Sequence, residues 1–98
     1  MSEKLVRDRI PDIIRADGRE CGCRTAGPEE YRSLLIAKLD EEVAEFKESG
    51  SLEELGDVRE VLVALAKEGG WSEEELLAEN RRKRDERGGF DSRVLLTL

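Results

Sequence analysis

Hydrophobic residues recur every three or four positions through the middle of this chain, which is the spacing of an amphipathic helix. Pro28 opens one such segment, which we expect to run to about Glu48. After the break at residues 49–51, a second segment should end at Lys67 or Glu68. A break this short joins antiparallel neighbours. The pattern therefore predicts a helical hairpin at the centre of the fold.

Two shorter helices are predicted on either side of the hairpin. Pro11 suits the first turn of a short helix that ends at Arg15 or Ala16. Ser72, followed three residues later by a glutamate, predicts a capping box at the start of a last helix to about Arg87.

The fold class expected is all-α, with one domain over residues 1–98 that forms a helical hairpin bundle of about four helices. The β-prone tail 93–98 and the segment 23–25 are the candidates for a minor two-stranded β patch, although isolated pairs of strands are marginal.

Composition and charge restrict the partners. The net charge of −7 argues against binding to nucleic acid polymers or to anionic membranes, which attract basic surfaces. No apolar run is long enough to span a membrane and no signal-peptide core follows the charged start, so we expect a cytoplasmic protein. Cys21 and Cys23 should then stay reduced. Because 98 residues bury only a modest core, self-association as a homodimer or homotetramer is expected.

Two glutamates fall on the apolar sides of the hairpin helices. At about 100° per residue, Glu42 lies in the middle of the stripe that Leu35, Leu39 and Phe46 form. Glu54 falls among the apolar positions of the following helix. Carboxylates are almost never fully buried unless they are paired or bind a metal. This placement favours a cation site over a solvated run of charges.

Each hairpin helix offers a second carboxylate three residues further on, Glu45 and Asp57. Across an antiparallel turn, Glu42 should lie opposite Asp57 and Glu45 opposite Glu54. Four like charges at one site repel strongly, and Mg²⁺, which prefers oxygen ligands, would relieve the repulsion. The competing interpretation is structural, because Glu54 three residues after Ser51 also fits a capping box.

The pattern Glu41-Glu42-x-x-Glu45, followed by Glu54-x-x-Asp57, resembles the metal-binding signature of the all-α nucleoside triphosphate pyrophosphohydrolases. That superfamily includes MazG and phosphoribosyl-ATP pyrophosphohydrolase. The runs at residues 4–11 and 87–90 resemble flanking motifs of its short, MazG-like members, so the resemblance covers nearly the whole chain.

This resemblance implies a MazG-like bundle and four ligands for magnesium, with manganese as a substitute: Glu42, Glu45, Glu54 and Asp57. It implies that Glu41 activates water or supports a ligand. Only eight residues separate Glu45 from Glu54, fewer than is usual in that superfamily, which leaves the substrate open.

Cationic side chains are needed to hold phosphates beside such a site. Asn80, Lys83 and Arg87 share one face of the last predicted helix and resemble a segment that contacts substrate in MazG proteins. Arg7 and Lys4 in the basic N-terminal cluster are the next candidates for substrate binding. The structural alternative for the last helix is a C-terminus enriched in cations that suit the helix dipole.

The predicted function is magnesium-dependent hydrolysis of a nucleoside triphosphate to a monophosphate and pyrophosphate, of the house-cleaning type, in an assembly whose chains border each site. One alternative keeps this chemistry and takes phosphoribosyl-ATP as the substrate. The other is a non-catalytic helical module for dimerisation or nucleotide sensing, in which Glu42→Gln would change no turnover.

Overall fold

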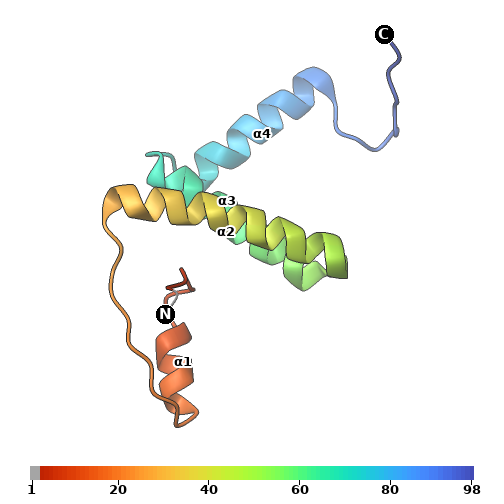
Figure 1. Cartoon of the computed structure of the whole chain (residues 1–98). Helices are drawn as coiled ribbons and strands as arrows, with labels where there is room; N and C mark the ends of the chain where they lie inside the picture. Colours follow the sequence, from red (N-terminus) through yellow and green to blue (C-terminus); the bar gives the residue numbers. More distant parts are fainter. Residues whose placement is uncertain (1–2) are drawn as a thin grey trace.

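The chain folds into four helices connected by short turns and one longer loop (Figure 1). The structure is a computed structural model that describes residues 3–98, so the first two residues of the predicted domain lie outside the described part. The helices are α1 (Ile10–Ala16), α2 (Pro28–Ser49), α3 (Leu52–Glu68) and α4 (Glu73–Arg87). The predicted all-α class is confirmed, and all four helices lie within a residue or two of their predicted bounds.

The turn between α2 and α3 makes a tight antiparallel hairpin. Gly50 ends α2 in the left-handed region, at a φ of 64°, where a residue without a side chain is favoured. Its N–H donates to the carbonyl of Phe46 at 2.7 Å. Ser51 then caps α3 by accepting a hydrogen bond from the N–H of Glu54 at 3.2 Å. Two residues therefore reverse the chain and bring α2 and α3 side by side (Figure 1).

The buried residues of the described chain all lie on this hairpin. They are Leu35 and Glu42 on α2, and Val61, Val63 and Ala66 on α3. Neither α1 nor α4, both fully described, contains a buried residue. The hydrophobic core is therefore one seam between two helices, and it includes a carboxylate.

The other two helices extend away from the hairpin. Of the described helices, α4 packs only against α3 and projects from it, whereas α1 lies apart at the end of the loop that leads into α2 (Figure 1). The radius of gyration is 17.2 Å, against about 13 Å for a compact domain of 100 residues. Several large apolar side chains are consequently exposed on the hairpin and on the C-terminal arm: Ile36, Leu55, Leu62, Trp71, Leu77 and Phe90.

The suggested two-stranded patch does not form, because residues 3–98 contain no strand. The tail passes alone into solvent, with Val94 and Leu95 exposed, and has no surface to cover. Arg24, in the other candidate segment, instead forms paired hydrogen bonds with Glu3 and Glu30 at 2.7–2.9 Å. Both cysteines are free thiols. Among the described helices, none is long and apolar enough to cross a membrane.

Candidate metal centre

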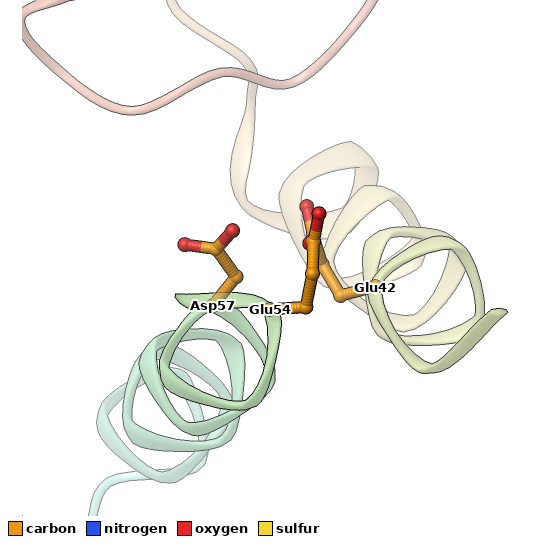
Figure 2. A group of neighbouring side chains, drawn as sticks. All are labelled: Glu42, Glu54 and Asp57. Carbon is orange, nitrogen blue, oxygen red and sulfur yellow. The ribbon is translucent and has the colours of Figure 1, made fainter. Parts of the chain in front are cut away.

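Three of the four predicted metal ligands come together at the hairpin. Glu42 from α2 and Glu54 and Asp57 from α3 each offer a carboxylate oxygen, and these three oxygens lie within 4.8 Å of one another. Figure 2 shows the three side chains rising to the same side of the two helices. Carboxylates cannot donate hydrogen bonds to one another when they are ionised. The three oxygens are close enough together to be candidate ligands for one cation.

Glu42 is the buried member of the group. The residue is 7% exposed, and its Oε1 lies 3.3 Å from the Nζ of Lys38. Its Oε2 is buried without a hydrogen-bond partner among residues 3–98. Burial raises the pKa of Glu42, the neighbouring Glu45 adds to the rise, and Lys38 opposes it. A buried oxygen with no partner destabilises the folded chain, and a metal ion held between the three carboxylates would satisfy it.

Glu54 is free to bind a metal ion because its side chain takes no part in the cap of α3. Only its backbone N–H bonds to Ser51, and the reciprocal bond of a capping box is absent from this described turn. At α4, by contrast, Ser72 and Glu75 form both bonds of a capping box, as predicted. Glu54 Oε2 is buried and unpaired within the described residues. It is directed to the same place as Glu42 (Figure 2).

Glu45 does not join the group of three, so the expected convergence of four carboxylates is reduced by one. It lies about 60° around α2 from Glu42 by the helical period, and its side chain is half-buried beside the site. It remains close enough to contribute to the raised pKa of Glu42. Glu54 therefore shares its group with Glu42 and Asp57, the pair that the turn register placed opposite each other, while Glu45 lies outside this group.

The N-terminal segment supplies cations to this acidic surface. Lys4 Nζ lies 2.9 Å from Glu41 Oε1, and Arg7 Nη2 lies 2.7 Å from Asp57 Oδ1. The contact with Lys4 lowers the pKa of Glu41 and raises that of Lys4 itself. Lys4 and Arg7, predicted as substrate contacts, are thus at the acidic site, and Glu41 lies at its edge.

Lys38 is a member of the site that the sequence prediction missed. Besides Glu42, it approaches Glu41 Oε1 at 3.5 Å, and its side chain is mostly buried. Its positions three and four residues before the two glutamates are the signal that could have identified it.

The predicted phosphate contacts on α4 form a separate surface. Asn80, Lys83 and Arg87 border a pocket of about 720 Å³ together with Phe90 and the glycines before it. Helix α4 projects away from the hairpin, so within one chain this pocket is apart from the carboxylates (Figure 1). The three residues do share one surface, as their spacing predicted, but a single chain does not bring them to the metal centre.

No family model matches the chain, and no solved structure matches it. A protein of Mycolicibacterium smegmatis, described only as uncharacterized, is 59% identical to this chain over 44 residues. The match covers 45% of this chain and 45% of that protein, so it spans less than half the length of either. These comparisons name no function, so a proposal about function depends on the geometry of the site and on the sequence motifs.

Proposed function

We propose that this protein is a magnesium-dependent nucleotide pyrophosphohydrolase, which cleaves a nucleoside triphosphate to a monophosphate and pyrophosphate. One observation is the main support: among the described residues, Glu42 and Glu54 each hold a buried carboxylate oxygen without a partner, and both belong with Asp57 to one group of oxygens within 4.8 Å. Apolar packing does not require such an arrangement, and a hard divalent cation would stabilise it. The resemblance of the acidic segments to the MazG-like signature supports the same function.

The residues present fit magnesium, because every donor in the group is a carboxylate oxygen. Glu42, Glu54 and Asp57 would hold the ion, with Glu45 beside them as a further oxygen donor. Manganese, which takes similar ligands, would substitute. When bound, the ion supplies positive charge that polarises the phosphoryl oxygens of the substrate.

The remaining groups at the site have roles that follow from their charge. Glu41 lies at the edge of the site, where its carboxylate is the candidate to accept a proton from an attacking water. Lys4 and Arg7 place two cations at the rim, where they would contact phosphate oxygens. Proton transfer from water to Glu41 requires no histidine, which the chain does not contain.

A second chain would complete the site. The phosphate-binding candidates Asn80, Lys83 and Arg87 are apart from the carboxylates within one chain, and the hairpin exposes Leu55 and Leu62. Pairing two hairpins into a bundle would cover these apolar side chains and allow α4 of one chain to border the acidic site of the other. The active form proposed is therefore a homodimer, or a tetramer built from two dimers.

The test is a screen for pyrophosphate release from canonical and damaged nucleoside triphosphates, with Mg²⁺ and with a chelator. Glu54→Gln should lower the magnesium-dependent rate at least about 100-fold, since it removes a ligand rather than a supporting group. Glu60→Gln on the exposed side of α3 is the matched control and should keep the wild-type rate. If no substrate yields a magnesium-dependent product, the enzyme assignment is wrong.

Two results would redirect the assignment. Turnover of phosphoribosyl-ATP alone would keep the chemistry and change the substrate. Magnesium or nucleotide binding without any turnover would instead identify a sensing or dimerisation module, for which the exposed apolar side chains of the hairpin are the supporting observation.

A further inference from the structure

The cations at the acidic site come from a segment far away in the sequence. Residues 3–9 precede α1, yet this segment passes over the side of the hairpin to which the three carboxylates point (Figure 2). The Arg7–Asp57 contact joins residues 50 positions apart, and it is a charged hydrogen bond of 2.7 Å. Such a contact is shorter and stronger than a neutral hydrogen bond. The N-terminal segment is thus attached at the site itself.

These contacts satisfy only the outer oxygens of the site. Lys4 and Arg7 reach Glu41 Oε1 and Asp57 Oδ1, whereas Glu42 Oε2 and Glu54 Oε2 stay buried and unpaired within residues 3–98. The segment therefore neutralises the rim of the site and leaves its interior for a smaller cation.

We propose that Arg7 is the residue that sets the metal affinity of this site, because it pairs with Asp57 and would give Asp57 up when a divalent cation binds. The inference rests on the proposed metal centre. A divalent ion bound to Asp57 would face the guanidinium across one carboxylate, and two cations in contact repel each other. Loading the site then exchanges an internal cation for an external one, and Arg7 becomes free to contact an anionic substrate.

The direction in which metal affinity changes when Arg7 is removed distinguishes competition from a structural role. If Arg7 merely orients Asp57 for the metal, as a supporting group does, its removal weakens metal binding. If Arg7 competes with the metal, its removal tightens metal binding. Both outcomes can be measured without any substrate.

The experiment titrates the full chain with Mn²⁺ alone and follows free Mn²⁺ by electron paramagnetic resonance. Arg7→Gln is compared with wild type and with Arg9→Gln, which removes the same charge two residues away from an exposed side chain that has no ion pair among residues 3–98. Arg7→Lys retains a cation without the fork and should fall between wild type and Arg7→Gln.

Arg7→Gln should bind Mn²⁺ about two- to fivefold more tightly than Arg9→Gln, the range that an exposed charge pair allows. The Arg7 Nε–Hε signal in a nitrogen-15 correlation spectrum, assigned by its loss in Arg7→Gln, should shift when Mg²⁺ is added. In chains that also carry Asp57→Asn, the Arg7→Gln substitution should no longer change Mn²⁺ affinity, because the competing pair is then gone.

Equal or weaker Mn²⁺ binding by Arg7→Gln, relative to Arg9→Gln, would overturn the proposal and leave the metal centre standing. A wild-type chain that binds no Mn²⁺ would overturn both. Binding that survives Glu54→Gln unchanged would place the metal elsewhere and equally reject the competition at Asp57.

Discussion

The hairpin of α2 and α3 and the two arms attached to it differ in how their apolar residues are used. The hairpin buries Leu35 and Val63 almost completely, to 3% and 6% exposure, whereas the C-terminal arm leaves Phe90 at 97% and Leu95 at 95%. The carboxylates follow the same division, since all three of the convergent oxygens belong to the hairpin. One chain thus brings the three candidate metal ligands together by itself.

The cations show a corresponding division between the two arms. The N-terminal segment reaches the acidic site through Lys4 and Arg7. The C-terminal arm keeps Lys83 and Arg87 on its own pocket, away from the hairpin. The proposed metal binding and substrate binding therefore depend on different levels of structure: the first on a single hairpin, the second on how chains assemble.

Removing a hairpin core side chain should have the largest effect. Leu35→Ala leaves a cavity in a seam with few other buried residues, and we expect a loss of about 2–5 kcal/mol in the free energy of unfolding. Leu95→Ala, in the exposed tail, should stay within about 0.5 kcal/mol of wild type. Urea unfolding followed by circular dichroism measures both. Similar losses for the two variants would mean that the arm is part of the core.

A charge placed on the exposed hairpin surface should weaken the proposed self-association. Leu62→Glu ought to weaken self-association at least about tenfold, since a carboxylate would be buried between two hairpins. Val94→Glu adds the same charge to the tail and should leave the assembly intact. Sedimentation velocity over a range of protein concentrations reports the change. Dissociation by Val94→Glu alone would assign the interface to the arm instead.

Neutralising Glu42, the buried carboxylate, should have the smallest effect. Unlike Leu35→Ala, it should raise the free energy of unfolding. The raised pKa of Glu42 means that its protonated form favours folding at low pH, and this contribution is lost as the pH rises through that pKa. In metal-free buffer, Glu42→Gln should therefore raise the free energy of unfolding at pH 7 by about 1 kcal/mol. The gain should disappear below pH 4.5, the ordinary value for this carboxyl.

Glu41→Gln is the control for that pH dependence. Lys4 lowers the pKa of Glu41, so the ionised form stabilises the fold above the ordinary pKa and loses this contribution as the pH falls. Its replacement should therefore reduce stability at pH 7. Denaturant unfolding at pH 7 and pH 4 distinguishes the two signs, and a stabilising effect of both variants would show that net charge alone is responsible.

Local signals in the sequence were sufficient to predict the helices. Pro28 and Ser72 mark helix starts, and Gly50 marks an end, because each acts through its own backbone or cap. The apolar stripe also identified Glu42 and Glu54 correctly as inward-facing carboxylates. These features depend on residues fewer than five positions apart, where helical geometry is fixed.

The features that the sequence did not predict depend on how the helices pack against each other and on where the N-terminal segment and the C-terminal tail lie. The turn register predicted that Glu42 faces Asp57, and both belong to the group of three, but the register did not predict that Glu45 would lie outside this group. The Arg7–Asp57 contact spans 50 positions, and no local pattern encodes such a pair. The expected β patch failed for the same reason, since the tail had no neighbour to pair with.

Arg24 keeps the N-terminal segment close to the candidate metal centre, which bears on the proposed exchange at Asp57. Its guanidinium holds Glu3 and Glu30 together, tying the start of the chain to the first turn of α2. An Arg7 side chain that releases Asp57 therefore stays tethered nearby, at an effective concentration that does not change with dilution. In the proposed exchange, metal ions would compete with an Arg7 side chain that is always present, so occupancy of Asp57 would follow the free metal concentration and not the protein concentration.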